Sequence, residues 1–267
     1  PDCPVAALYR ESKLAEDGSR SLAKLAKLLG EFPAVFVPGT RWQYSYATDV
    51  LAHCMEVACD KPLDQILHEL ILKPLGMNET DFHVNPADMD RLMPVYGAQS
   101  LSDIMSPPEG EQTLKLTNVE PSYPASAKGQ FRRGGLGLFS TTRDYLRFAE
   151  CLHSGKTADG KRLLSTPMFN LMWANRLPAS QMPLGIGPNI YPGYGWNLFG
   201  RVMLDVGQAM SLTSNGEGGW AGAAATYFWV DPAQQMTGVV MTQYLGSALP
   251  MSGEMRAAAY SMLDKYQ

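Results

Sequence analysis

Histidine carries much of the hydrolytic chemistry that proteins perform near neutral pH, and the sequence has four histidines. His53 and His68 fall inside expected helices, His83 follows the turn LGMNETDF, and His153 ends an expected helix. A Ser-His-Asp hydrolase presents its serine on a G-x-S-x-G turn, and the sequence contains no such turn. Metal-dependent hydrolases show H-x-x-x-H or H-x-x-E-H, and neither pattern occurs. The sequence therefore disfavours both mechanisms.

The composition indicates a globular protein that acts on a small molecule. With 267 residues and 45% hydrophobic content, the chain can bury a substantial core, and this length favours one domain. A net charge of −4 with scattered Lys and Arg predicts no nucleic-acid or membrane partner. No apolar stretch reaches the roughly 18 residues of a membrane span. The compartment is not predicted.

The cysteines give no sign of a metal site or a cofactor. They form no C-x-x-C pair and have too few histidines near them for zinc ligation. We expect reduced, structural thiols at Cys3, Cys54, Cys59 and Cys151 and no cofactor.

Helical periodicity dominates the first two thirds of the chain. Leucines and alanines recur at helical spacing over 19–29, with a stop at Gly30. After a Pro- and Gly-punctuated loop over 32–42, residues 44–63 predict a long, mostly buried helix, and 63–77 a shorter one ended by Pro74 and Gly76. Residues 85–132 are irregular, as in a functional loop that would set substrate specificity. A glycine-rich turn over 132–142 then leads into a helix.

The last third predicts strands and one helix. Three segments are rich in β-branched and aromatic residues and are bounded by turn formers, at 193–204, 223–232 and 236–245. We expect them to form antiparallel strands of one sheet. The tail over 253–266 has a helical period.

Four landmarks in this order carry a family resemblance: FVPGTRWQYS, LILKPLGMNETDF, GGLGLFSTTRDYLRFAECL with GKRLLS, and GGWAGAAATYFWVDP. Together they resemble the serine β-lactamase and penicillin-binding-protein superfamily, close to the class C-type esterases, from about Pro38 onward. The resemblance implies an α+β fold of the β-lactamase/transpeptidase type, an antiparallel sheet flanked by helices. It predicts a single domain over 1–267, with a helical region at about 10–175 and strands and a final helix at about 190–267.

The resemblance also implies site residues. The superfamily uses a Ser and a Lys in S-x-x-K, a Tyr or Ser base, and a K-T-G-like strand. A serine hydroxyl needs a neighbouring base, and a tyrosine serves as one only where positive charge favours its phenolate. Tyr44 falls on the family's catalytic tyrosine, while Tyr46 stands where many members have Asn. Taken alone, Tyr44 would be an ordinary aromatic residue at the start of a helix.

The K-T-G position is occupied by Trp220, Ala221 and Gly222. Without the lysine ammonium, the site lacks the cation that would hold a substrate carboxylate, which favours a neutral ester over a penicillin. By resemblance, Gly222 and Ala223 would let substrate lie along the strand, and the Ala223 N–H would donate to the oxyanion. The plainer interpretation of Trp220 is core packing.

Structural interpretations are preferred for two neighbouring features. Glu217, in NGEGGW, is expected to be an exposed loop acid, although a carboxylate beside the strand could tune the site. The glycines Gly134, Gly135 and Gly137 are expected to permit a tight turn.

The S-x-x-K motif is missing from its expected place, well upstream of Tyr44, and the N-terminus looks like a cut. Ser21-Leu22-Ala23-Lys24 fits the bare pattern but lies in an amphipathic helix close to Tyr44, so we interpret it as a coincidence. Lys156-Thr157 lies in an expected surface turn and is not the K-T-G strand. We expect the Ser-Lys pair to lie in a preceding segment or a companion chain.

The sequence therefore predicts a serine hydrolase that cleaves a small-molecule ester through an acyl-enzyme. An acyltransferase or a weak β-lactamase of the same family is the first alternative. The second is a catalytically silent homologue that binds ligand without turnover.

Overall fold

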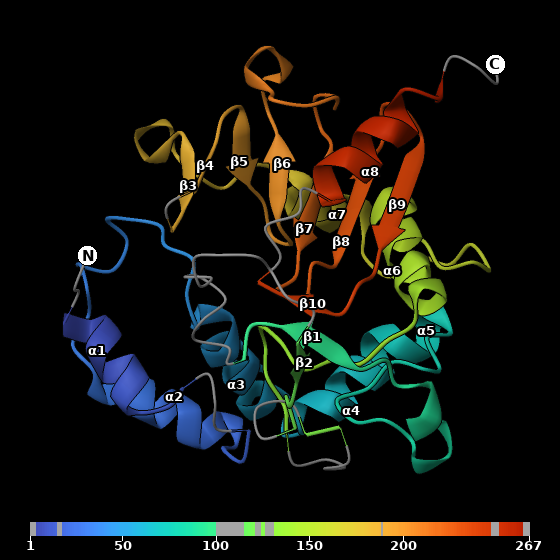
Figure 1. The fold of residues 1–267 in the computed structure, drawn as a ribbon. Coiled ribbons are helices and arrows are strands. Elements are labelled where there is room, and N and C mark those ends of the chain that lie inside the picture. Colours follow the sequence, from blue (N-terminus) through green and yellow to red (C-terminus); the bar gives the residue numbers. More distant parts are fainter. Residues whose placement is uncertain are drawn as a thin grey trace. The chain divides into compact units, whose positions relative to one another are not determined.

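The computed structural model describes residues 4–14, 18–99, 115–120, 124–125, 131–187, 189–246 and 251–263 (Figure 1). Contacts divide the chain into two compact units, each of which is described by itself. The first unit comprises Pro1–Lys73, Asn78–Thr141 and Gln243–Ser247. The second comprises Pro74–Met77, Thr142–Thr242 and Ala248–Gln267. The single domain over 1–267 stays a prediction.

Most of the regular secondary structure in the described part of the first unit consists of short helices. They are α1 (Pro4–Glu11), α2 (Leu22–Glu31), α3 (Ala47–Cys59), α4 (Leu63–Leu67), the π-helix η1 (His68–Leu72) and the 3-10 helix η2 (Pro86–Arg91). Helix α3 packs against α2 and α4. One buried cluster includes a residue from each helix together with Phe82: Leu22, Ala52, Leu63 and Phe82. Amphipathic spacing thus places one apolar stripe of each helix on a shared core.

Helix α3 corrects the prediction of a long, mostly buried helix over 44–63. It has 13 residues, and its chain leaves the helical conformation at Asp60, which is left-handed with φ 50°. Its buried residues are Asp49 and Ala52, whereas Leu51 is 60% exposed and Val57 is 70% exposed. Apolar composition over the whole segment gave no indication of which stripe is covered, so the prediction of burial was wrong.

The next helical run is close to the prediction. Helix α4 continues through η1 into α5 (Lys73–Leu75), and Gly76, with φ +67°, follows its end. Pro74 lies inside α5 and does not end it. Because proline has no N–H and its ring crowds the carbonyl four residues back, a π-turn before Pro74 relieves the helical hydrogen-bond pattern.

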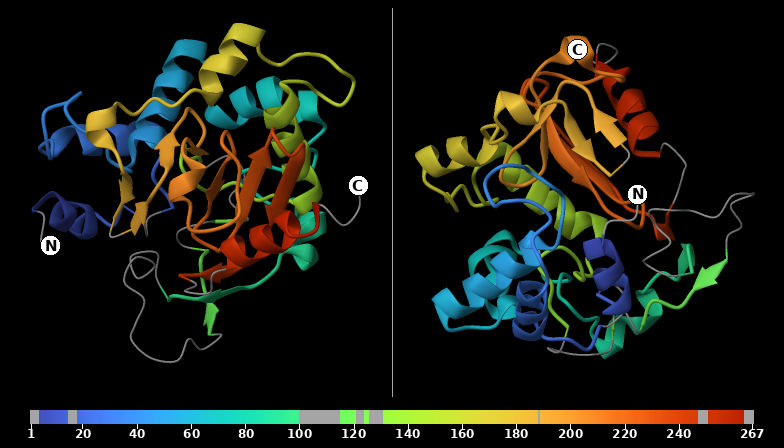
Figure 2. Two further views of the ribbon diagram at one scale, coloured as in Figure 1. Left: turned by 90° about the horizontal axis from the view of Figure 1, so that it is seen from above. Right: turned by 90° about the vertical axis from the view of Figure 1, so that its left-hand side faces the viewer.

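The second unit is built on a five-stranded antiparallel sheet in the order β5-β6-β7-β8-β9. The strands are β5 (Tyr194–Trp196), β6 (Arg201–Met203), β7 (Gly218–Ala221), β8 (Tyr227–Asp231) and β9 (Met236–Val240). Helix α6 (Thr142–Ser154) covers one face, α8 (Met251–Tyr260) covers the other, and α7 (Thr166–Trp173) lies on the α6 side (Figures 1 and 2). A hairpin of β3 (Leu184–Ile186) and β4 (Asn189–Tyr191) precedes the sheet.

Strand β8 shows why this sheet needs two layers of helices. All five of its residues are buried, and successive side chains point to opposite faces. Phe228 and Val230 pack with Ala149 and Leu152 of α6. The alternate residues face the α8 side, where Tyr260 of α8 donates a hydrogen bond to Asp231. The predicted antiparallel sheet flanked by helices is confirmed.

Four short strands depart from the sequence prediction. Strand β10 (Tyr244–Leu245) does not join the five-stranded sheet; it pairs in parallel with β1 (Val95–Gly97), which pairs antiparallel with β2 (Leu116–Thr117). Thus β1 and β2 lie inside the region predicted as helical, and β3 begins before residue 190. Two- and three-residue strands carry too few positions for a period to be visible. None of the described helices is both long and apolar enough for a membrane span.

Truncating Val230 tests the core of the second unit. Val230 is completely buried, so Val230→Ala should lower the free energy of unfolding by about 2 kcal/mol through lost burial and a residual cavity. Denaturant titration measures this change. The matched control is Val206→Ala, at a side chain that is 45% exposed, which should shift the free energy by no more than about 0.5 kcal/mol. Equal effects at the two positions would contradict the assigned core.

Candidate active site

Tyr44 lies in the extended segment just before α3, in the first unit. Its side chain is 49% exposed. Two residues later Tyr46 occupies the N-cap position, and its carbonyl accepts the N–H groups of Asp49 and Val50. The Ser45 hydroxyl accepts the N–H of Ala47 at 3.2 Å. Tyr44 therefore projects from backbone that leads directly into a hydrogen-bonded helix start.

Asp49 carries a buried charge in the first turn of α3. Its side chain is 3% exposed, and one carboxylate oxygen accepts the Gly134 N–H at 3.1 Å. Burial raises the pKa of Asp49 above its ordinary value of 3.8, against the opposing influence of the Gly134 N–H and of Arg133. Burying the ionised carboxylate therefore lowers the stability of the fold, and this carboxylate lies only a few residues after Tyr44 in the sequence.

The predicted strand residues lie together in the second unit. Trp220 is in β7, Gly222 follows the strand, and Ala223 is in the turn before β8. The turn is closed by Gly222 N–H to Thr226 O at 2.8 Å and Ala225 N–H to Gly222 O at 3.1 Å. Gly222 and Ala223 are exposed, whereas Trp220 is partly buried.

Packing accounts for part of the Trp220 surface. The indole meets the Trp196 ring edge-on at 4.6 Å between centroids and lies against the cluster around Phe228. The core interpretation of Trp220 is therefore correct for the buried part of its ring. Its role in lining a site, and the oxyanion role of Ala223, stay predictions.

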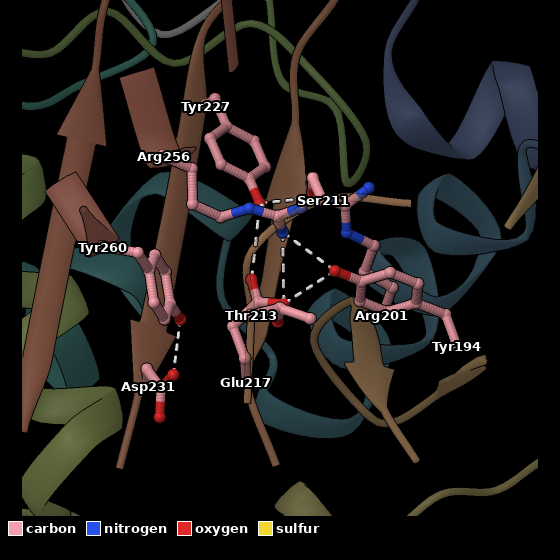
Figure 3. A network of polar contacts seen from close by, with 9 residues as sticks. All are labelled: Tyr194, Arg201, Ser211, Thr213, Glu217, Tyr227, Asp231, Arg256 and Tyr260. Atoms are coloured by element: carbon pink, nitrogen blue, oxygen red, sulfur yellow. Dashed lines mark hydrogen bonds and ion pairs between the residues drawn. The ribbon is translucent and has the colours of Figure 1, made fainter. Parts of the chain in front are cut away.

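A buried polar network lies directly before β7. Glu217 is fully buried, and one of its oxygens accepts from Tyr194 Oη at 2.9 Å, Thr213 Oγ1 at 3.0 Å and Arg256 Nη1 at 3.2 Å (Figure 3). Arg256, from α8, also donates to the phenol oxygen of Tyr227 at 3.2 Å. The network thus connects the final helix to the beginning of β7.

The burial of Glu217 corrects the sequence prediction, which was an exposed acidic residue in a loop. The surrounding glycines indicate the reason. A Cβ at Gly218 would lie 2.7 Å from Trp173, so the glycines allow close packing and do not mark a loose turn. Glycines on both sides of a carboxylate at a strand start were the signal that could have indicated burial.

Tyr227 shows that nearby cations alone do not make a base. Arg201 donates to its phenol oxygen at 2.6 Å, and Arg256 donates to the same atom. Even so, burial raises the pKa of Tyr227 to about 12, since desolvation outweighs the two arginines. The phenol stays protonated at neutral pH and serves the network as a hydrogen-bonding group.

The two incomplete motifs have structural roles. Ser21 is the N-cap of α2, and its hydroxyl accepts the Lys24 N–H at 3.3 Å. Its backbone is extended, with φ −68° and ψ 160°, as expected of an N-cap residue. Lys156 forms an isolated antiparallel β-bridge with Arg162 after α6, and it is not part of the five-stranded sheet. These positions agree with both sequence interpretations, and the assignment of the nucleophile to a serine other than Ser21 stays a prediction.

Other predicted features are only partly described. Residues 100–114, 121–123 and 126–130 of the irregular 85–132 stretch lie outside the described residues, and so does Cys3. The remaining cysteines are free thiols, with Cys54 and Cys59 exposed and Cys151 buried. Gly137, with φ +101°, fits the expected turn. Among the described residues, no group of histidine, cysteine and acidic side chains could hold a metal ion.

Comparison with known proteins places these features in a family. A family model described as Beta-lactamase matches residues 6–260. Protein Rv1367c of Mycobacterium tuberculosis is 31% identical over 249 residues, which are 90% of this chain and 57% of that protein. Esterase EstB of Burkholderia gladioli is 26% identical over 241 residues, 87% of this chain and 58% of the esterase. The chain thus spans little more than half the length of these relatives.

Solved structures agree on the fold. EstCE1, described as a hydrolase with promiscuous acyltransferase activity, superposes with a TM-score of 0.74 at 23% identity. The match covers 92% of this chain and 63% of EstCE1. A penicillin-binding-protein homologue from Caulobacter crescentus superposes with a TM-score of 0.65 at 16% identity, over 96% of this chain and 70% of that one. The predicted β-lactamase/transpeptidase-like fold is therefore confirmed.

Removing Glu217 should strongly destabilise the second unit. Glu217→Ala leaves the buried guanidinium of Arg256 without its carboxylate, and a broken buried pair costs about 3–5 kcal/mol. The free energy of unfolding measures the loss. Lys161→Ala, which breaks an exposed ion pair with Asp159, is the control and should change it little. A Glu217 variant as stable as this control would contradict the network.

Asp49→Asn should change how stability depends on pH. The folded-state pKa of Asp49 is raised, so its favourable contribution exists when it is protonated, below its ordinary value of 3.8, and is lost as pH rises through the folded value. The variant keeps an acceptor for Gly134 and has no charge to desolvate. Its advantage over the native chain should grow from acid to neutral pH in denaturant titrations. A constant difference would show that the carboxylate is not held at a raised pKa.

Proposed function

The chain belongs to the β-lactamase family, and on that premise we propose that it is the larger part of a serine hydrolase that cleaves carboxylic esters through an acyl-enzyme. One observation carries the proposal. Tyr44 lies in the PGTRWQYS segment just before α3, while Trp220 lies in β7 at the position that the resemblance assigns to the family lysine. An esterase and a hydrolase with acyltransferase activity among the similar proteins support this reaction class.

Each step of the reaction has a group to perform it. Tyr44, as base, would take the hydroxyl proton of the nucleophilic serine while the serine oxygen bonds to the ester carbonyl carbon. The Ala223 N–H would stabilise the resulting oxyanion. Collapse expels the alcohol, which receives the proton from Tyr44 and leaves an acyl-serine. Water, deprotonated in the same way, then releases the carboxylic acid and the free serine.

The nucleophile is assigned outside these 267 residues. The Ser21 hydroxyl caps α2, and we therefore assign the Ser-Lys pair to a preceding segment or a companion chain. The lysine would supply the positive charge that Tyr44 needs in order to act as a base. A small-molecule ester is the proposed substrate.

The chemistry of Trp220 argues for a neutral ester. An indole can pack against an acyl or alcohol group but offers no charge to a carboxylate, which a lysine would pair with. Acyl transfer to an alcohol other than water is the second candidate, favoured by the description of EstCE1. The two reactions share the acyl-enzyme and differ in what attacks it.

A fluorophosphonate probe tests the mechanism directly. The native preparation is treated with the probe, and the modified residue is mapped by peptide mass spectrometry. We expect label on a serine in an S-x-x-K peptide outside the 267 residues. Tyr44→Phe should slow labelling and ester turnover by about 10²- to 10⁴-fold, the usual range for a lost general base.

Ser21→Ala is the matched control. It removes the helix cap, at a cost of about 1 kcal/mol in stability, and should leave the rate of labelling unchanged. Label on Ser21 would overturn the assignment of the nucleophile. A folded protein that takes no label would favour the silent binding homologue.

A further inference from the structure

We propose that Asp49 is a positioning residue that fixes the first turn of α3 against the glycine-rich loop and thereby sets the direction of the Tyr44 phenol. The glycine-rich loop is residues 131–137. This inference rests on the function proposed above, because it assigns Asp49 a task that matters only if Tyr44 acts as the base.

Asp49 contacts the loop where no side chain would fit. Its carboxylate accepts the Gly134 N–H at 3.1 Å. A Cβ added at Gly134 would lie 2.0 Å from the Thr48 carbonyl oxygen, which is backbone and has little room to move. At Gly135, a Cβ would lie 2.9 Å from Thr48 Oγ1. The loop backbone therefore lies directly on the first turn of α3, and the Asp49 hydrogen bond secures this approach.

The loop itself is held by Arg133. Arg133 is 4% exposed, and its guanidinium donates to the Arg20 carbonyl at 2.6 Å and to the Arg132 carbonyl at 2.8 Å. It also lies over the Phe131 ring, 4.7 Å from the centroid. Arg20 directly precedes the N-cap of α2. Asp49 thus ties the start of α3 to a loop that is anchored at the start of α2.

The same turn holds the backbone next to Tyr44. The Asp49 N–H donates to the Tyr46 carbonyl at 3.0 Å, so both the main chain and the side chain of Asp49 are used. The Tyr46 ring meets Tyr9 edge-on at 5.7 Å between centroids. Tyr44 lies two residues before Tyr46 and is 49% exposed, so a shift of this turn would displace the backbone that carries the phenol.

The cost of the carboxylate supports a functional role. Burial raises the pKa of Asp49, so holding the ionised group inside the first unit weakens stability at neutral pH. Ionisable groups held at such a cost cluster at functional sites. A base must lie within hydrogen-bond reach of the proton it removes. A small displacement of Tyr44 would therefore lower the reaction rate substantially.

A double-mutant cycle separates positioning from general stabilisation. Asp49→Ala, Asp49→Asn, Tyr44→Phe and the Asp49→Ala/Tyr44→Phe double variant are compared in the native, full protein with p-nitrophenyl acetate. Asp49→Ala should lower kcat about 10- to 100-fold with KM nearly unchanged. Asp49→Asn keeps the acceptor for Gly134 and should retain most of the activity. In the Tyr44→Phe background, Asp49→Ala should have no further effect on kcat.

The outcomes distinguish the inference from the proposed function. If Asp49→Ala lowers kcat by the same factor with and without Tyr44, Asp49 does not act through Tyr44 and the inference is overturned while the proposed function stands. Full activity in Tyr44→Phe would contradict the proposed function and the inference with it. Should Asp49→Ala not fold, Asp49→Leu fills the space without an acceptor and takes its place. If neither variant folds, Asp49 is a stability residue and the inference fails.

Discussion

Glu217 places a negative charge inside the second unit, and three donors converge on one of its oxygens. A carboxylate without any exposed surface is tolerated only where its charge and its lone pairs are matched. The matching cation, Arg256, comes from the last helix, 39 residues further along the chain. The position of α8 on the sheet and the position at which β7 begins are thus fixed by the same ion pair.

This constraint has a consequence for the strand that follows. Trp220 lies three residues after Glu217 and Ala223 lies six after it, so any shift in the start of β7 would move both. A one-residue slip along β8 would also reverse which side chains face α6. The ion pair therefore acts on register as well as on stability. Asp49 is its counterpart in the first unit, a buried carboxylate that fixes the backbone near Tyr44.

The two buried carboxylates differ in how they are matched. Glu217 has a guanidinium and three hydroxyls as donors, and its site is rich in positive charge because Arg201 lies against the same tyrosines. Asp49 accepts backbone N–H groups, among them those of Gly134 and Gly135, and lies near Arg133, whose guanidinium donates to carbonyl groups. The better-matched group fits a structural role. Burial raises the pKa of Asp49, as expected where a charge is retained for something other than stability.

Sequence patterns predicted the parts of the fold that depend on local order. The helical period predicted α2 and α8, and β-branched and aromatic runs predicted β8 and β9, while the single segment predicted over 193–204 is divided into β5 and β6. They failed where the deciding partner is distant in sequence. Strand β10 pairs with β1, almost 150 residues earlier, and Glu217 pairs with Arg256. The burial of α3 was wrong for a related reason, because composition gives no information on which stripe a neighbour covers.

The site residues were predicted from sequence motifs, which do not specify the positions of side chains. Ser21 shows how a motif can match without the geometry that the reaction needs. Its S-x-x-K spacing matches the nucleophile motif, yet the chemistry needs both side chains on one helical face with a hydroxyl free to lose its proton. At an N-cap, the serine lies outside the helical conformation and its oxygen accepts the Lys24 N–H. The role of Ser21 as a helix cap is therefore enough to explain why a serine occurs at this position. Tyr44 differs from Ser21 in that it lies before the N-cap of α3 and is 49% exposed, a position from which its phenol could reach a serine supplied from elsewhere.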